Sequence, residues 1–308
     1  MDKVADSGMK VNYKKKNSVL SSDVLIPKIL AFFAVISVLT TVGIVAILVI
    51  ESLGFFREVP FWTFISGTNW TPLFEPPSFG VLPLVTGTLL ITIIASIVAI
   101  PIGLGSAIYL SEYANPKVRN IVKPILEILA GVPTIVYGFF ALTFVTPIIR
   151  FIIPQTEIFN ALSAGIVVGI MIIPIISSMS EDAMVAVPNA LRNGAYALGA
   201  TKLEVALKIV LPAALSGVVA SFVLGISRAI GETMIVTLAA GSMAVMAYNP
   251  LQSIQTLTAY IVSVSSGDTQ YGSTEYLTIY AVGITLFVMT LVMNILASYI
   301  SRKFREEY

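Results

Sequence analysis

Long stretches without a charged residue constrain this chain more than any other feature. Only 11% of its 308 residues are charged, against about 25% in a typical soluble domain, and those charges fall in clusters. About 20 apolar residues cross the hydrocarbon core of a bilayer as a helix, so a charge-poor stretch of this length predicts a membrane span. The chain is therefore predicted to be an all-α, polytopic membrane protein.

Six stretches are predicted as transmembrane helices. The first is too long for the apolar region of a signal peptide, so it is predicted to be an uncleaved span. Pro101 and Pro133 lie inside the second and third and predict kinks or breaks, which helices in lipid tolerate. The fifth is either one long helix or a helix followed by a re-entrant piece. The predicted spans are 27–50, 80–110, 124–149, 159–179, 213–244 and 277–300.

The distribution of lysine and arginine predicts the orientation. With six spans and both termini in the cytoplasm, 15 of the 18 basic residues are cytoplasmic; Arg57 and Arg150 lie outside, and Arg228 lies within a span. Such an excess marks the cytoplasmic side of membrane proteins. We therefore expect a multi-pass protein of the cell membrane. Its predicted parts are a disordered cytoplasmic tail (1–24), a first transmembrane helix (25–53), an extracytoplasmic aromatic loop (54–79) and a main transmembrane domain (80–304).

The predicted outer loop and its flank are rich in aromatic residues. Such residues are frequent where a span meets the membrane–water interface. Anchoring at that interface is the simpler interpretation, and a docking surface for an external partner is the alternative. The residues are Phe55, Phe56, Phe61, Trp62, Phe64, Trp70 and Phe74.

Several kinds of chemistry are excluded by composition. The chain has no cysteine and no histidine, which rules out zinc sites built on those ligands and Cys or His nucleophiles. It has no Gly-Lys dipeptide and therefore no Walker A loop for ATP. We expect no catalytic residues, no metal, no bound cofactor and no nucleic-acid partner; membrane lipid surrounds the chain.

The predicted cytoplasmic loop 181–210 reads as two short helices joined by a turn. Pro188 suits the first turn of one helix, and Gly199 suits its left-handed C-terminal cap. Thr201 and Glu204 form a capping box that starts the second helix. That helix carries Leu203, Leu207, Val210 and Leu211 at the spacing of one apolar face and ends where Pro212 leads into span five. It is either an amphipathic loop on lipid headgroups or an element that a partner can push.

Arg228 and Glu232 are the leading candidates for contact with a transported substrate. Arg228 follows Pro212 by 16 residues, about 24 Å along an ideal helix, which places it deep in the membrane. A charge there must face a partner or a wet cavity, and the four-residue spacing lets Arg228 and Glu232 pair on one helix face. A structural ion pair and a pathway site remain open. Thr134 and Thr256 are weaker pathway candidates, and Glu127 is expected to pair locally with Lys123.

The loop also resembles a family motif. Asn193-Gly194-Ala195, then Gly199, then Ile209-Val210-Leu211-Pro212 is similar to the EAA loop of ABC importer permeases, although Asn193 and Gly194 depart from its Glu and Ala. The resemblance implies the type I importer permease fold. It also implies that the loop supplies a coupling helix for a separate ATPase. The residues expected in that coupling are Asn193, Ala195, Gly199, Thr201, Glu204, Ile209, Leu211 and Pro212.

Segments across 60–304 resemble the PstC family of phosphate permease subunits. This resemblance implies import of inorganic phosphate with a PstA-like second permease, a PstB-like ATPase dimer that binds ATP and Mg, and a PstS-like phosphate-binding protein. A permease for sulfate, molybdate or tungstate is the alternative in the same class, and an ion-coupled secondary transporter is a more distant one. The segments are Phe61–Phe64, Gly67–Pro72, Gly87–Leu89, Ile108–Tyr113, Leu129–Thr134 and Arg228–Thr233.

Overall fold

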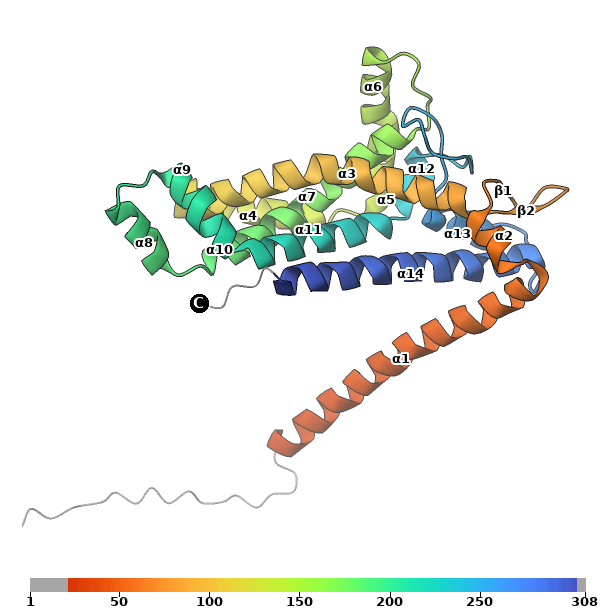
Figure 1. Cartoon of the computed structure of the whole chain (residues 1–308), viewed down its shortest axis with the longest axis horizontal. Coiled ribbons are helices and arrows are strands. Elements are labelled where there is room, and N and C mark those ends of the chain that lie inside the picture. Colours follow the sequence, from red (N-terminus) through yellow and green to blue (C-terminus); the bar gives the residue numbers. More distant parts are fainter. Residues whose placement is uncertain (1–21, 304–308) are drawn as a thin grey trace, which may run out of the picture. The chain divides into compact units, whose positions relative to one another are not determined.

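Figure 1 shows the computed structural model of the chain, which describes residues 22–303. Contacts divide the chain into two units, residues 1–47 and 48–308. The first helix, α1 (Ser22–Glu58), begins in one unit and ends in the other. Of the predicted tail, residues 1–21 lie outside the described part, and 22–24 already belong to α1.

In the first unit, α1 is apolar around its whole circumference. Leu30, Phe32 and Val38 are each 62% exposed, so most of each side chain is left uncovered by this unit. A helix that is hydrophobic on every side suits lipid. The prediction of a first membrane span is confirmed, but the helix continues to Glu58, so the loop that follows begins later than residue 54.

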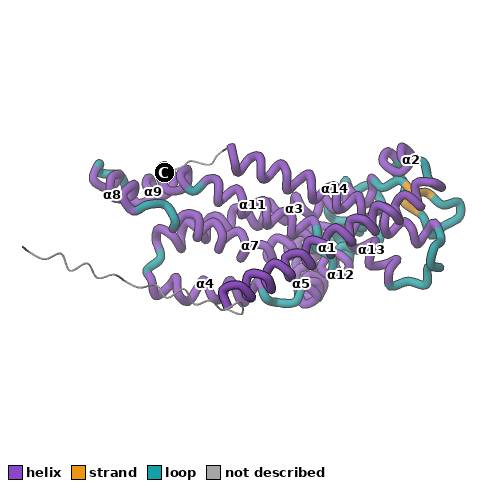
Figure 2. The backbone as a smooth tube through the Cα atoms, turned by 90° about the horizontal axis from the view of Figure 1, so that it is seen from below, coloured by secondary structure: helices purple, strands orange, loops and turns teal. Residues whose placement is uncertain are grey.

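The second unit is built on helices that run side by side. Figures 1 and 2 show these four together: α3 (Leu82–Ile108), α7 (Ala161–Val185), α11 (Leu215–Ile230) and α14 (Thr274–Lys303). The α3 and α7 backbones approach closely at Gly169, where a Cβ would lie 2.9 Å from Val98 Cβ and 3.0 Å from the Ala95 carbonyl oxygen. Small residues permit this kind of packing inside membranes. The core of the unit therefore lies between α3, α7 and the helices beside them.

Five helices are long and apolar enough to cross a membrane, and six are obtained if one bent pair counts as a single span. The pair joins Lys202–Ala213 to Leu215–Ile230 with a bend of 75°. We place the membrane-crossing part in α11, because the first member carries Lys202, Glu204 and Lys208. The all-α, polytopic prediction is confirmed, with five spans or six by this criterion. The other spans are Leu25–Glu58, Leu82–Tyr113, Thr134–Ile152, Ala161–Val185 and Thr274–Tyr299.

The third span differs from its predicted bounds of 124–149. The chain forms a separate amphipathic helix, α4 (Pro116–Ala130), and then breaks at Gly131 and Val132. The next helix starts after Pro133, because a residue before proline is disfavoured in helical conformation. It comprises α5 (Thr134–Phe140), the π-helical turn η2 (Ala141–Val145) and α6 (Thr146–Ile152). In Figure 1, α6 stands out from the layer of α3, α7 and α11.

The fifth span is broken rather than continuous over 213–244. Helix α11 ends at Ile230, a short helix α12 (Met234–Ala239) follows, and the chain then runs without regular structure to α13 (Leu257–Ser265). Of the two forms that the sequence left open, the interrupted one is present. Non-helical backbone at membrane depth is tolerated where protein or water surrounds it.

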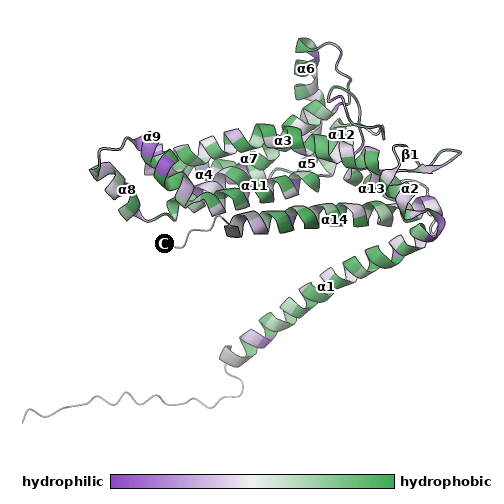
Figure 3. Cartoon of the chain, in the orientation of Figure 1, coloured by the Kyte–Doolittle hydropathy of each residue, from purple (hydrophilic) through white to green (hydrophobic). Residues whose placement is uncertain are grey.

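The two ends of the second unit differ in character. One end carries α8 (Asn189–Ala197), α9 (Lys202–Val205), the π-helical turn η3 (Ala206–Val210) and α10 (Leu211–Ala213), and Figure 3 shows hydrophilic residues on α9. Another π-helical turn, η1 (Tyr109–Tyr113), continues α3 toward this end. The other end carries α2 (Phe61–Ser66) and an antiparallel pair, β1 (Trp70–Thr71) and β2 (Ser78–Phe79), with Trp70 opposite Phe79.

The aromatic residues at the α2 end do more than the predicted anchoring. Phe55, Phe64 and Trp70 are buried, and their rings pack edge to face in a chain of contacts. Such pairs stabilise beyond the area that they bury, by about 0.5–1.5 kcal/mol each. Trp62 and Phe74, at 77% and 70% exposed, remain available to an interface. The loop is therefore a folded cap whose core is aromatic.

Candidate coupling element and substrate pathway

The segment from α8 to α10 forms a helix, a tight turn and a second helix. Pro188 is the N-cap residue of α8 rather than its first helical residue, one position earlier than predicted. Gly199 has a φ of +84°, the left-handed conformation that the sequence predicted for it. The capping box is confirmed: the Thr201 hydroxyl accepts from the Glu204 amide, and a Glu204 carboxylate oxygen accepts from the Thr201 amide at 3.0 Å. The turn is therefore specified by local residues.

Hydrogen bonding controls the ionisation of Glu204. The Thr201 backbone amide, the Lys208 ammonium and the Thr201 hydroxyl lower the pKa of this carboxyl from 4.5 to about 2. Lys208 lies one turn further along, with its Nζ 3.2 Å from Glu204 Oε1. The carboxylate is thus charged at neutral pH and holds the start of α9 in place.

Only part of the predicted apolar face of the second helix is buried. Val205 and Val210 pack against Met184 and Val187 at the end of α7. Leu203 and Leu207, predicted on the same face, are 55% and 44% exposed. Leu198, at the tip of the turn, is 91% exposed. We refer to these three exposed leucines, Leu198, Leu203 and Leu207, as the apolar patch of the element.

Arg192 ties α8 to the rest of the bundle. Its guanidinium donates to Glu112 Oε1 at 2.9 Å, to the Met184 carbonyl at 2.7 Å and to the Val187 carbonyl at 2.5 Å. These acceptors belong to the η1 turn after α3 and to the C-terminal end of α7 and the residues that follow it. One side chain therefore joins three parts of the fold, and charged hydrogen bonds of this kind are the strong ones. Nothing in the spacing of the motif indicated this residue.

A second ionic cluster fastens α4 to α7. The side chain of Glu181 is fully buried, with Arg119 Nη2 2.5 Å from one oxygen and Lys123 Nζ 2.8 Å from the other. Lys123 also reaches Asp182 at 2.5 Å. Burial tends to lower the pKa of Lys123, but its bonds to Asp182 and Glu181 outweigh this and raise it. The stability that Lys123 gains from these bonds is therefore fully present below pH 10.5, its ordinary pKa. It is lost as the pH rises through the higher pKa of the folded state.

This cluster corrects the prediction for Glu127. Within residues 22–303 that carboxylate makes no ion pair with Lys123 and is exposed. Arg119 and Lys123 lie four residues apart on an amphipathic helix, and Glu181-Asp182 end an apolar span on the same predicted side. These two features of the sequence could have indicated that Arg119 and Lys123 pair with Glu181 and Asp182.

Arg228 and Glu232 do not share a helix face as predicted, because α11 ends at Ile230 between them. Glu232 is buried, and its Oε1 accepts from the backbone amides of Met234 at 3.0 Å and Ile235 at 3.2 Å. It therefore caps α12. Arg228 lies in the last turn of α11, is exposed and makes no hydrogen bond or ion pair within the described residues. The predicted ion pair is absent there, and the guanidinium is free to meet an anion.

The two threonines predicted as weaker pathway candidates lie in different elements and differ in burial. Thr134 is the first residue of α5 and is half-buried. Thr256 is buried and caps α13, since its hydroxyl accepts from the Ala259 amide at 3.2 Å. Its neighbour Thr258 donates to the Glu232 carbonyl at 2.6 Å, which joins the break after α11 to the start of α13. Whether either threonine lines a path stays a prediction.

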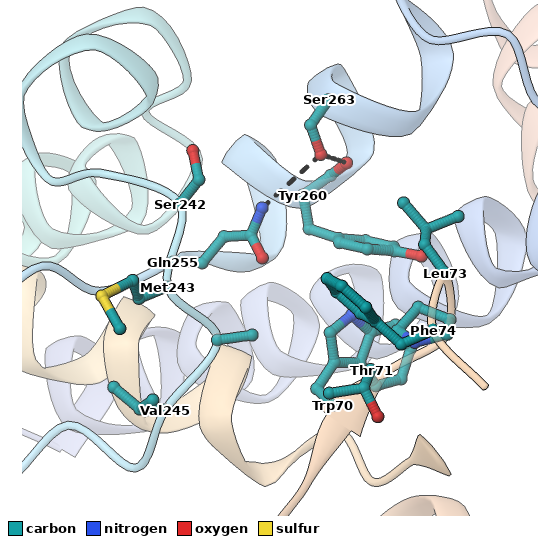
Figure 4. A pocket seen from close by; sticks show the side chains of 12 residues that line it. Trp70, Thr71, Leu73, Phe74, Ser242, Met243, Val245, Gln255, Tyr260 and Ser263 are labelled. Carbon is teal, nitrogen blue, oxygen red and sulfur yellow. Dashed lines mark hydrogen bonds between the residues drawn. The ribbon is translucent and has the colours of Figure 1, made fainter. Parts of the chain in front are cut away.

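A pocket of about 480 Å³ opens at the α2 end of the second unit (Figure 4). Trp70 and Phe74 approach it from the outer loop, while Gln255 and Tyr260 approach from the region of α13. The Trp70 and Tyr260 rings meet edge to face at 4.9 Å. The lining of this pocket contains polar but no charged side chains.

Comparison with known sequences gives a consistent family. The model of the binding-protein-dependent transport system inner membrane component matches residues 99–306. The chain is 36% identical over 240 residues to "Probable ABC transporter permease protein YqgH" of Bacillus subtilis, covering 78% of this chain and 77% of that protein. It is 32% identical over 299 residues to "Phosphate transport system permease protein PstC 1" of Mycobacterium tuberculosis, covering 86% and 88%. The corresponding protein of Pasteurella multocida is 33% identical over 284 residues, covering 85% and 86%.

Solved structures share the fold at lower identity. A chain of a bacterial alginate ABC transporter, in complex with its pentasaccharide-bound periplasmic protein, superposes with a TM-score of 0.63 at 16% identity, covering 94% of this chain and 99% of the other. A chain of the inward-facing MetNI methionine ABC transporter gives 0.58 at 21% identity, covering 73% and 96%. Together with the extent of the family match, these relationships show that the chain belongs to the binding-protein-dependent transport system inner membrane components, the permeases of ABC importers.

Proposed function

We propose that this chain is the permease subunit of an ATP-driven importer of inorganic phosphate. The observation that carries the proposal is the 30–33% identity, over 76–89% of the chain, to permeases named for phosphate transport. Its partners are a PstA-like permease, a PstB-like ATPase dimer that holds ATP and Mg, and a PstS-like binding protein outside the cell.

The α8–α10 element supports a role in coupling. Its apolar patch, Leu198, Leu203 and Leu207, is of the kind that marks a protein contact. We assign this patch to the cytoplasmic ATPase, in agreement with the positive-inside orientation. Force on the patch passes into α11 through the 75° bend and into α3 and α7 through Arg192.

Arg228 is the substrate-binding residue in this proposal. It lies in the last turn of α11, so movement of that helix moves its guanidinium. A planar guanidinium matches the oxygens of phosphate. Glu232 has one oxygen occupied by two backbone amides. Its other oxygen accepts a hydrogen bond from a protonated phosphate oxygen and repels sulfate, which has no proton to donate at neutral pH.

Uptake by the reconstituted complex tests this proposal. Proteoliposomes containing the full complex are given labelled phosphate or labelled sulfate with ATP inside. Arg228→Gln and Glu232→Gln are compared with Arg57→Gln, which changes an exposed arginine at the predicted outer end of α1. We expect ATP-dependent phosphate uptake that both pathway variants reduce by tenfold or more, about 1.4 kcal/mol, while Arg57→Gln retains it.

Three results would contradict the proposal. Preferential uptake of sulfate would assign the chain to the alternative oxyanion class. Uptake that persists after ATP depletion with the ion gradient intact would indicate a secondary transporter. Full uptake by both variants would remove Arg228 and Glu232 from the substrate pathway.

A further inference from the structure

The helix formed by α5, η2 and α6 packs against the bundle at its start and extends away from it at its end. α5 packs against α7 and α12, whereas α6 extends away from these helices in Figure 1. The side chains toward its end are apolar and open: Phe144 is 55% exposed, Phe151 89% and Ile152 71%. In a chain that spans a membrane, such a surface faces lipid or another apolar body.

A cavity of about 500 Å³ lies against this end of the helix. That volume is within the range of small-molecule sites, about 300–1,000 Å³. The cavity is walled mainly by apolar groups and contains a single charged side chain, that of Arg150. The lining residues are Leu142, Thr146, Pro147, Arg150, Phe151, Pro154 and Ile158.

Arg150 has no partner among the residues that the structure describes. It is exposed and makes no hydrogen bond or ion pair with any residue of the 22–303 range. The Glu157 carboxylate, on the segment after α6, forms no ion pair with Arg150 within the described residues; its Oε2 accepts from the Ser253 amide at 2.8 Å. A charged arginine beside an apolar helix is stable only where water, phosphate or an acid reaches it.

We propose that this cavity binds the headgroup region of an anionic phospholipid, with the lipid phosphate at Arg150. The guanidinium donates two parallel hydrogen bonds to the phosphate oxygens, and the apolar walls cover the glycerol and the first part of an acyl chain. The predicted orientation places the lipid in the outer leaflet.

The charge of the lining selects an anionic headgroup over a zwitterionic one. A choline or ethanolamine group would need a carboxylate or an aromatic cage, and the lining offers no carboxylate and one aromatic ring, Phe151. Phosphatidylglycerol presents its phosphate without a competing cation. The occupant we infer is therefore a lipid with a net negative headgroup.

Lipid binding to the purified full chain tests the inference. Native mass spectrometry compares retention of dioleoylphosphatidylglycerol with that of dioleoylphosphatidylcholine. We expect the wild type to favour phosphatidylglycerol and Arg150→Gln to lose that preference by about tenfold, the lower range for a charged hydrogen bond. Arg150→Lys, which keeps the charge without the planar fork, falls between. Arg57→Gln is the matched control and behaves as wild type.

A photo-crosslinker identifies what covers the site. This chain has no natural cysteine, so Phe151→Cys, labelled with benzophenone on the purified chain before assembly, gives this chain a single photo-crosslinker at the site. Crosslinks to lipid support the inference, and crosslinks to a second protein chain overturn it. It is also overturned by equal retention of the two lipids, by an unchanged preference in Arg150→Gln, or by displacement of the lipid with inorganic phosphate, which would indicate a simple anion site.

Discussion

Two glycines in the coupling element predict opposite effects of the same substitution. Gly199 has a φ of +84°, whereas Gly194 lies within α8. A Cβ added at either position meets no atom within 4 Å. Steric clash is therefore absent at both, and Gly199→Ala and Gly194→Ala differ only in backbone conformation.

The magnitudes follow from that difference. Left-handed backbone costs an L-residue about 1–2 kcal/mol, partly offset by about 0.4–1 kcal/mol because alanine restricts the unfolded chain. The mid-range values differ by about 1 kcal/mol, so Gly199→Ala should destabilise the turn by about that amount. Gly194→Ala should stabilise exposed α8 by about 0.5–1 kcal/mol, the usual gain for alanine over glycine inside a helix.

Amide hydrogen exchange over residues 189–213 of the full chain is the assay. We expect exchange to be about two- to tenfold faster in Gly199→Ala and slower in Gly194→Ala, since 1 kcal/mol changes a local opening equilibrium about fivefold. Asparagine tolerates the left-handed region, so Gly199→Asn should lie closer to wild type. Equal or inverted changes in the two alanine variants would refute the assignment of strain to φ at Gly199.

Three further results are expected. Glu181→Gln should destabilise the attachment of α4 to α7 by about 1–3 kcal/mol, less than the loss of a fully buried pair, because Lys123 keeps its contact with Asp182. Limited digestion with trypsin should then cleave within 119–123 faster than in the wild type, and an unchanged rate would contradict the ionic cluster. Because the pKa of Glu204 falls from 4.5 unfolded to about 2 folded, its stabilisation should be complete above about pH 4.5 and lost as the pH falls toward 2. NMR titration of labelled glutamate should show Glu204 titrating with a midpoint near pH 2, and a midpoint near 4.5 would exclude the capping box in solution. Gly87→Ala should lower thermal stability by about 1–3 kcal/mol, because its Cβ would lie 2.4 Å from the Gln255 carbonyl oxygen; an unchanged melting temperature would rule out this close approach.

Local signals in the sequence predicted much of the coupling element. Gly199, Thr201 and Glu204 act through the backbone of adjacent residues, so their roles can be inferred without the fold. Apolar run lengths likewise identified the membrane class. The break before Pro133 was one of the kinks or breaks predicted from proline, which restricts the residue before it, although the predicted bounds of 124–149 did not divide the span there.

The remaining features depend on contacts between distant segments. Arg192 meets Glu112 across 80 residues, and Lys123 meets Glu181 across 58. Neither pairing follows from a helical or strand periodicity in the sequence, so neither could be predicted from such a pattern. The end of α11 before Glu232 was missed because four-residue spacing is informative only on an unbroken helix, and the Glu232 carboxylate instead satisfies the first amides of α12.

Crosslinking from Leu198 tests the central claim that a separate ATPase drives this chain through the α8–α10 element. Leu198→Cys, the only cysteine in the chain, carries a short crosslinker at the most exposed point of the turn. In the assembled, transporting complex we predict a crosslink to the ATPase subunit, with loss of phosphate uptake while basal ATP hydrolysis continues. The contradicting result is a complex in which every Leu198→Cys side chain carries the crosslinker, none is joined to the ATPase, and phosphate uptake is normal.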